Sequence, residues 1–495
     1  MLETILVNDK KIDWLLVEEG FNIPSFNFVT EREKIIGRAG SVKKSRQLDE
    51  YDFEIPLIVR NDLHLTKESI KKHDDIANAL VSFFDYDKPV KLQFESKNWY
   101  WLAYFDGPIE IPNTPREFIK FSIKVILTDP YKYKVDGNQN TAISDQVSVV
   151  NSGTTDTPII VEARALKNSN YFMIAKGDKD YFMIGDDDVD VPSQDYSPSI
   201  YSSEMNTLTG WTKQGVGSVT DNYTGGLTGG SFQLSSTKNS TTILNYPEGT
   251  GWIGSLYKRS YSKSAQDFSV TVKIAVTQRK KGTARFAQYV YDTDNRLLAS
   301  IGYVNPSAKQ TIGRIIVTLF NQNGDQVKIY DYKNTPPLYN LGDLIVYMRL
   351  VRKGNTFTIK TWKYKDVSYP ERITPIDSHT KTYVDKGNFY QRPVSSLGLY
   401  LAKHSSSDFM STYILGTYNR ELLPKPTNAR DMIIKQGDLI TIDTATQNVL
   451  VNDEPFLHEK TFGSNFFNVD DGYNELMIYP ENTFDTNVKW QDRYL

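Results

Sequence analysis

The sequence contains no cysteine, which excludes disulfide bonds and thiolate zinc sites. No stretch approaches the roughly 20 apolar residues that a transmembrane helix needs, so we expect no membrane partner. The first residues, MLETILVNDKKIDWLL, lack the basic start and long apolar run of a secretory signal. A net charge of −3 gives no overall attraction to nucleic acid or to an anionic membrane.

Motifs for catalysis and metal binding are also missing. No phosphate-binding glycine loop or nucleophile elbow occurs, and no two histidines stand at metal-ligand spacing. The acidic run Asp186–Asp188 with Asp190 lacks the glycine and closing glutamate of a calcium loop. We interpret it as a solvated turn, with a weak calcium site as the alternative. We therefore expect no catalytic residues, no metal site and no cofactor.

Residues 1–135 form the first predicted domain, an α+β unit. Stretches such as YDFEIPLIVR, VKLQFES, WYWLAYFDG and REFIKFSIKVILTDPYKY alternate as strands do. Between them, TKESIKKHDDIANALVSFF has helical spacing, with Thr66 as a candidate cap. The apolar positions of this helix are Ile70, Ile76, Ala77, Leu80 and Val81.

The segment KQGDLITIDTATQNVLVND, residues 435–453, predicts a β-hairpin with too little chain after it to build a sandwich of its own. Strands of the same kind begin at residue 147, in VSVVNSGTTDTPIIVEARA. We therefore expect residues 136–195 and 428–495 to be two parts of one domain. Residues 196–427 would then be an insertion, which a loop tolerates because closure cost grows slowly with length.

The inserted residues have the pattern of an all-β sandwich. Long strands such as DFSVTVKIAVTQ, RIIVTLFNQ and DLIVYMRLVRKGNTFTIKTWKY recur at regular spacing, without a helix. Stretches rich in proline and polar residues, VDVPSQDYSPSIYSSEMNT and NRELLPKPTNARD, border this region on each side. The sequence therefore predicts an independent domain between two linkers.

Several of these segments resemble the distal tail protein of siphophages that infect Gram-positive hosts. They are FVTEREKIIGRAGSV, DFEIPLIV and LTDPYKYK near the start, with VVNSGTTDTPIIVEA, IKQGDLITIDTATQNVLVN and GYNELMIY farther on. The resemblance covers about 1–190 and 428–495. It implies a mainly β protein, with a ring-forming α+β domain and a galectin-like β-sandwich. The insertion resembles a concanavalin-like jelly roll of the carbohydrate-binding type.

The resemblance also implies partners and a location. Copies of the N-terminal domain would join into a homohexamer between the tail tube protein and the tail-associated hub protein. Genomic DNA would pass through the central channel without specific binding. The protein would be assembled in the host cytoplasm and end in the virion, at the tail tip. The insertion would contact host cell-wall polysaccharide or teichoic acid.

Aromatic residues supply the candidate ligand site. In VYMRLVRK and FTIKTWKY, strand alternation places Tyr347, Arg349, Trp362 and Tyr364 away from the apolar face formed by their neighbours. Aromatic rings stack on the apolar faces of sugars, so these four residues are the predicted glycan patch. The alternative is that they are ordinary core residues, since sandwiches bury aromatics on their inner faces.

Basic residues concentrate in the N-terminal domain, where GRAGSVKKSR contains Arg38, Lys43, Lys44 and Arg46. One interpretation is an exposed loop. The other is a surface that faces the DNA channel or an acidic partner, where a modest, salt-screened charge would suit a conduit.

Two other functions remain open at this point. A soluble lectin or adhesin would use the N-terminal domain only to oligomerise. A glycan-cleaving enzyme would need two carboxylates that flank the scissile bond. The insertion has few glutamates, and they are far apart in the sequence: Glu204, Glu248, Glu371 and Glu421. No E-x-D-x-x-E strand is present, which argues against the enzyme, although aspartates could take the role.

Overall fold

The chain divides into two compact units in the computed structural model: Met1–Asp187 with Ile433–Leu495, and Asp188–Met432. Strands dominate both, which confirms the mainly β prediction. The structure describes residues 3–25, 27–60, 73–111, 118–177, 180–188, 193–277, 279, 281–309, 313–367, 374–427 and 429–495. The predicted cap Thr66 and the helix residue Ile70 lie outside these ranges.

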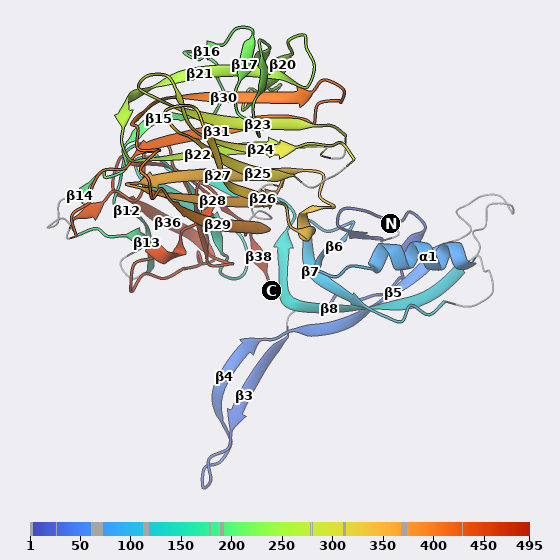
Figure 1. The fold of residues 1–495 in the computed structure, drawn as a ribbon. Helices are drawn as coiled ribbons and strands as arrows, with labels where there is room; N and C mark the ends of the chain where they lie inside the picture. The colour runs from blue at the N-terminus through green and yellow to red at the C-terminus, as the bar shows by residue number, and fades with distance from the viewer. Residues whose placement is uncertain are drawn as a thin grey trace. The chain divides into compact units, whose positions relative to one another are not determined.

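The N-terminal part of the first unit is a curled antiparallel sheet (Figure 1). Its order is β1 (Ile5–Val7), β6 (Val90–Phe94), β7 (Trp99–Asp106), β8 (Phe118–Lys134), β5 (Tyr51–Arg60) and β2 (Leu15–Val17). The two edge strands, β1 and β2, lie close to each other. The Val17 amide donates to the Glu3 carbonyl at 2.9 Å, and Thr4 Oγ1 donates to the Leu15 carbonyl at 2.6 Å. The curl encloses a core that includes Leu57, Trp101 and Val125.

Helix α1 (His73–Phe84) covers this core with one face. Ile76 and Leu80 are buried, as the helical spacing predicts, and so is Phe84 one turn farther along the helix. Val81, which also has the helical spacing, does not face the core, since 54% of it is exposed. It follows Leu80 directly, so it is rotated by about 100° to the solvent side.

Strands β3 (Phe28–Glu33) and β4 (Val42–Leu48) form a separate two-stranded hairpin. Figure 1 shows it running away from the curled sheet of the same unit. An isolated hairpin buries little surface and is marginally stable alone. This segment therefore has the geometry of an arm rather than of a core element.

The rest of the first unit is a β-sandwich. One sheet has the order β10 (Gln146–Asn151), β36 (Gly472–Tyr479), β12 (Tyr171–Lys176) and β13 (Asp180–Gly185). The other has the order β35 (Glu454–Pro455), β34 (Asn448–Val451), β33 (Leu439–Asp443), β11 (Ile159–Ala165), β37 (Phe484–Trp490) and β9 (Asn138–Thr141). Their inner faces share a core with Val161, Phe172 and Leu476.

The predicted hairpin at 435–453 is present as β33 and β34. Asp443 Oδ1 accepts hydrogen bonds from the Ala445 and Thr446 amides at 2.9 and 3.2 Å, which fixes the turn between the strands. β33 pairs with β11 in antiparallel register, with Ile442 opposite Val161. Strands more than 270 residues apart in sequence are thus neighbours, as the hairpin pattern predicts.

The last strand, β38 (Arg493–Tyr494), ties the two parts of this unit together by pairing with β8. Just before it, the carboxylate of Asp492 is fully buried. Lys134 Nζ contacts this carboxylate at 3.3 Å, and Asn138 Nδ2 and the Ser152 amide donate to it at 3.1 and 3.2 Å.

The second unit is a larger sandwich of two layers (Figure 1). The first sheet has the order β19 (Ser231–Leu234), β20 (Thr241–Asn245), β31 (Thr412–Glu421), β22 (Phe268–Val276), β27 (Leu344–Lys353), β28 (Thr356–Lys365) and β29 (Asp377–Val384), with β15 (Ser199–Ser203) against β31. The second has β17 (Gly217–Val219), β18 (Gly226–Thr228), β21 (Trp252–Ala265), β30 (Val394–His404), β23 (Ala284–Asp292), β24 (Leu297–Asn305), β25 (Arg314–Phe320) and β26 (Gln326–Lys333), with β16 (Thr212–Lys213) against β21. Apolar side chains of both layers, Val272 and Leu399 among them, form one core.

The two ends of the second unit lie side by side. β14 (Ser193–Gln194) pairs in parallel with β32 (Arg430–Asp431), and Arg430 Nη1 donates to the Asp188 carbonyl at 3.0 Å. Adjacent ends are what an insertion into a loop requires.

We therefore expect residues 188–432 to be removable. Joining residue 187 to residue 433 by a short glycine-rich linker should leave a folded first unit, because its described core residues all come from outside the deleted range. Circular dichroism and thermal melting of the shortened chain measure this outcome. Aggregation or loss of a cooperative transition would show instead that the two units share a core.

Candidate functional site

The predicted aromatic patch lies on one face of neighbouring strands. Tyr347 on β27 is directly opposite Trp362 on β28, and their rings stack at a centroid distance of 4.9 Å and an angle of 8°. Tyr364 contacts Tyr347 edge-on at 6.1 Å. Val346 and Met348, which alternate with Tyr347, belong to the main core. Alternation therefore predicted the correct face, opposite the main core.

The patch is not an open stacking surface, however. Tyr347, Trp362 and Tyr364 are only 3%, 2% and 1% exposed. Long cationic side chains lie beside the rings: the Arg349 guanidinium is 5.0 Å from the Trp362 centroid, and Lys273 Nζ is 5.1 Å from that of Tyr347. Arg349 Nε also donates to Thr271 Oγ1 at 3.0 Å. The aromatic residues thus form a packed layer, and a sugar could not stack on them without displacing neighbours.

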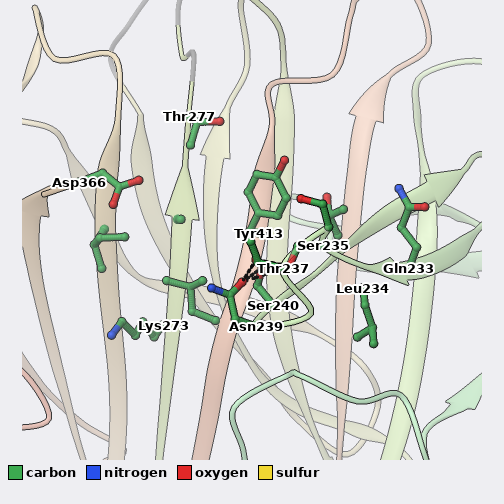
Figure 2. Close-up of a pocket in the computed structure, with 15 residues that line it drawn as sticks. Gln233, Leu234, Ser235, Thr237, Asn239, Ser240, Lys273, Thr277, Asp366 and Tyr413 are labelled. Carbon is green, nitrogen blue, oxygen red and sulfur yellow. Dashed lines mark hydrogen bonds between the residues drawn. The ribbon is translucent and has the colours of Figure 1, made fainter. Parts of the chain in front are cut away.

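A groove of about 790 Å³ borders this layer on the same sheet (Figure 2). Its apolar lining comes from Leu234 and from Ala275, Ile345 and Leu415, and the last three belong to or pack against the aromatic cluster. Its polar lining comes from the β19–β20 hairpin and the neighbouring strands: Gln233, Ser235, Ser236, Thr237, Asn239, Ser240, Thr242, Lys273, Thr277, Asp366 and Tyr413. We call this feature the sheet groove.

The β19–β20 turn holds its polar groups in fixed positions. Asn239 Oδ1 accepts hydrogen bonds from Thr237 Oγ1 at 2.7 Å, Ser235 Oγ at 3.1 Å and Ser240 Oγ at 3.3 Å (Figure 2). With the oxygen engaged, the Asn239 Nδ2 group remains a donor for a ligand. Tyr413 is half-buried and lies beside this turn in Figure 2. The arrangement combines an aromatic ring with hydroxyl and amide groups.

Sequence reasoning missed the β19–β20 turn and Tyr413. The signal available was the run QLSSTKNSTT, in which polar residues that favour turns separate two short strands. Such a run predicts a turn, but it does not predict that the turn lies beside the outer face of β22 and β31. That contact depends on tertiary packing.

The predicted basic residues are on the β3–β4 arm. Arg38, Lys43, Lys44 and Arg46 are all exposed. Lys44 Nζ lies 3.7 Å from a Glu31 carboxylate oxygen and 3.8 Å from one of Glu33. The Arg46 guanidinium packs over the Phe28 ring at 3.9 Å. The glutamates of β3 therefore offset part of the positive charge of β4.

The side chains that could bind a metal ion or cleave a glycan are histidines and carboxylates. Within these ranges, no cluster of three or more histidine, aspartate or glutamate side chains could hold a metal ion. The described lining of the sheet groove includes one carboxylate, Asp366, whereas glycoside hydrolysis ordinarily uses two. In the described part of the chain, no helix has the length and apolar character to cross a membrane.

Two family models match the chain. The phage tail protein RIFT-related domain matches residues 10–127, and the siphovirus-type tail component C-terminal domain matches residues 430–494. No curated protein matches the chain in sequence.

Among solved structures, the chain is similar to the CBM2 module of the evolved Dit of Lactobacillus casei BL23 phage J-1, with 15% identity, TM-score 0.37, and 48% of this chain and 100% of that one covered. It is similar to SPP1 Dit, with 16% identity, TM-score 0.32, and 38% and 75% covered. It is also similar to a family 16 endo-glucanase from Bacteroides ovatus, with 11% identity, TM-score 0.28, and 44% and 99% covered.

The two matched segments lie in the predicted order, one in the curled N-terminal sheet and one in the strands from 430 onward that complete the smaller sandwich. Tail component families of this kind favour a structural role and place their members in the virion, among other tail proteins. The chain thus contains two segments that match siphophage tail component families, with a large β-sandwich between them.

Proposed function

We propose that this protein forms a ring at the phage tail tip and that the second unit attaches the particle to glycan of the host cell wall. The ring would be a homohexamer between the tail tube protein and the hub protein, assembled in the host cytoplasm. Genomic DNA would cross it without specific binding. The sheet groove is the single observation that carries the attachment role.

The β3–β4 arm supports assembly with further copies. Ile36 at its tip is fully exposed, and Ile35 and Val29 are about half exposed. Apolar side chains on an arm with no core of its own lose their contact with water only against another surface. In a ring, that surface would be supplied by the neighbouring copy.

The sheet groove suits a neutral or weakly charged sugar chain. Sugars present hydroxyls that need donors and acceptors, and apolar faces that need an aromatic ring or an aliphatic surface. The Asn239 amide and the hydroxyls of the β19–β20 turn meet the first need, while Tyr413 and Leu415 meet the second. Each ring would carry several grooves, so weak single contacts would sum to strong attachment.

The described lining of the sheet groove fits attachment to a glycan better than cleavage of one. The described lining supplies one carboxylate, Asp366, whereas hydrolysis ordinarily uses an acid and base pair. Reducing-sugar release from host walls incubated with the protein should stay at the level of the buffer control.

Binding of the full chain to purified host cell walls tests the attachment role. Replacing Asn239 by alanine removes a donor and releases the turn hydroxyls that it holds, and we expect a two- to ten-fold loss of affinity per lost hydrogen bond. Tyr413→Ala should also weaken binding. Tyr223→Ala, a half-buried tyrosine outside the groove, is the control and should bind as the wild type does. Wall binding that both groove variants retain would move the site elsewhere.

A further inference from the structure

A second groove of the inserted unit, of about 480 Å³, lies along the edge of β21. β16 pairs with this strand only at Tyr257 and Lys258. The polar and aromatic side chains that line the groove include Tyr201, Thr212, Lys258, Arg259, Ser260 and Asn295. The described lining contains no carboxylate. We call it the edge groove.

Lys258 is held in place by uncharged groups. Its Nζ lies 3.5 Å from the centroid of the Tyr291 ring and donates to Asn295 Oδ1 at 2.7 Å. Partial burial lowers the pKa of Lys258 below its ordinary value. Within the described ranges, the structure pairs this ammonium with no carboxylate. Among the described residues, only the Tyr291 ring and Asn295 Oδ1 compensate the loss of water around the Lys258 ammonium.

The Arg259 guanidinium packs against Tyr201 of β15 and the loop that precedes β16. It lies 5.3 Å from the Tyr201 centroid, and Nη1 is 3.5 Å from the Thr209 carbonyl. Gly210 makes this approach possible, since it has a φ of +77° and a Cβ at this position would overlap Arg259 Nη1. Among the described residues, no acidic side chain pairs with this guanidinium either.

Two cations that the protein orients with neutral groups are chemically suited to an anionic ligand. A partly desolvated positive charge gains more from a ligand anion than a charge in bulk water does. Arginine forms paired hydrogen bonds with phosphate oxygens, and the hydroxyls of Thr212 and Ser260 add neutral hydrogen-bonding groups in the same groove.

We propose that the edge groove binds a phosphodiester flanked by polyol hydroxyls. This site is separate from the sheet groove, and it would give the inserted unit a second contact with an anionic wall polymer. The binding strength should fall with added salt, because part of the attraction is between exposed charges.

Calorimetric titration of the full chain with a glycerol-phosphate oligomer tests the site. Lys258→Gln and Arg259→Gln should each weaken binding about ten- to a hundred-fold, as expected for lost charge-assisted hydrogen bonds. Gly210→Ala keeps both charges but displaces the guanidinium, and it should also weaken binding. Lys381→Gln, which removes an equal charge from an exposed position on β29, should have no such effect.

Further measurements separate this site from the others. Tyr413→Ala should leave oligomer binding unchanged, so failure of the sheet groove and failure of the edge groove are distinguishable. Thermal melting of each variant identifies any loss of fold. Equal affinity for inorganic phosphate alone, or for a uronic acid oligomer, would overturn the assignment to a polyol phosphodiester. Absence of binding by the wild type, or full binding by folded Arg259→Gln and Lys258→Gln variants, would overturn the site itself.

Discussion

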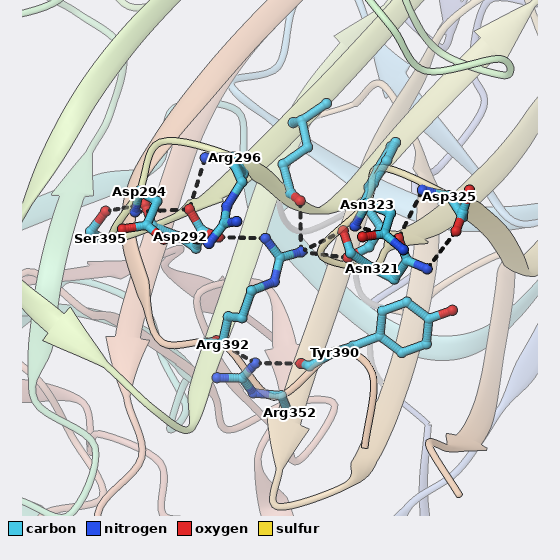
Figure 3. Close-up of polar contacts among 12 residues, drawn as sticks. Asp292, Asp294, Arg296, Asn321, Asn323, Asp325, Arg352, Tyr390, Arg392 and Ser395 are labelled. Atoms are coloured by element: carbon cyan, nitrogen blue, oxygen red, sulfur yellow. Dashed lines mark hydrogen bonds and ion pairs between the residues drawn. The ribbon is translucent and has the colours of Figure 1, made fainter. Parts of the chain in front are cut away.

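Replacing Arg392 by methionine is expected to lower the free energy of unfolding of the inserted unit by about 3–5 kcal/mol. The Arg392 guanidinium forms an ion pair with Asp292, and the Asp292 side chain is 2% exposed (Figure 3). Arg392 Nη2 also donates to the Phe320 carbonyl at 2.5 Å and to the Leu297 carbonyl at 2.9 Å. Methionine fills similar space but leaves a buried carboxylate and the carbonyl groups of Leu297, Phe320 and Asn321 without this donor.

The control for this prediction is Arg296→Met. Arg296 contacts the same Asp292 carboxylate at 3.3 Å, but its side chain is 48% exposed. Exposed ion pairs contribute little, so the expected loss is about 0–1 kcal/mol. Urea denaturation followed by tryptophan fluorescence measures both variants. A loss below 1 kcal/mol for Arg392→Met would contradict the view that this pair holds the ends of β23, β24 and β25 together.

The second large effect concerns assembly. Ile36→Asp should abolish the ring while leaving the melting temperature of the chain unchanged. The side chain of Ile36 is fully exposed, and the described part of the β3–β4 arm forms its own sheet, so the change removes no core contact. In the ring, a charge would have to be buried against the neighbouring copy without a partner, which is strongly unfavourable.

The matched control is Phe462→Asp, because Phe462 is an equally exposed apolar residue on a different loop. Analytical ultracentrifugation should show rings for wild type and Phe462→Asp, and monomers for Ile36→Asp. Rings that persist in the Ile36 variant would show that the tip of the arm does not contribute to the interface.

Strand patterns predicted much of this fold. Alternation identified the 435–453 hairpin, and its lack of a local sheet correctly led to pairing with the strand at 159–165. Alternation also placed Trp362 on the face opposite the main core. A period of two gives the direction of a side chain, but it says nothing about what covers that face. The burial of Trp362 and Tyr347 depends on neighbouring strands and long cationic side chains, and those contacts emerge only in the folded structure.

The sheet groove and the edge groove could not be predicted either, because they too depend on contacts between segments that are distant in the sequence. Arg259 and Gly210 lie about fifty residues apart in sequence, and Asn239 and Tyr413 lie more than 170 apart. Each pair meets because strands from distant segments are neighbours in one sheet or lie beside one edge. In the β3–β4 arm, by contrast, the charges lie on adjacent strands. Glu31 and Glu33 partly offset the positive charge of Lys44, and this follows from the local sequence.

The central claim is that copies of this chain close into a ring that presents wall-binding units. Negative-stain electron microscopy of the purified full-length protein, with its mass measured in solution, tests the claim most directly. We predict closed rings with a central channel and a mass of six chains, as the family resemblance implies. A monomer or dimer at high protein concentration, without rings in the images, would contradict the account and favour a soluble lectin.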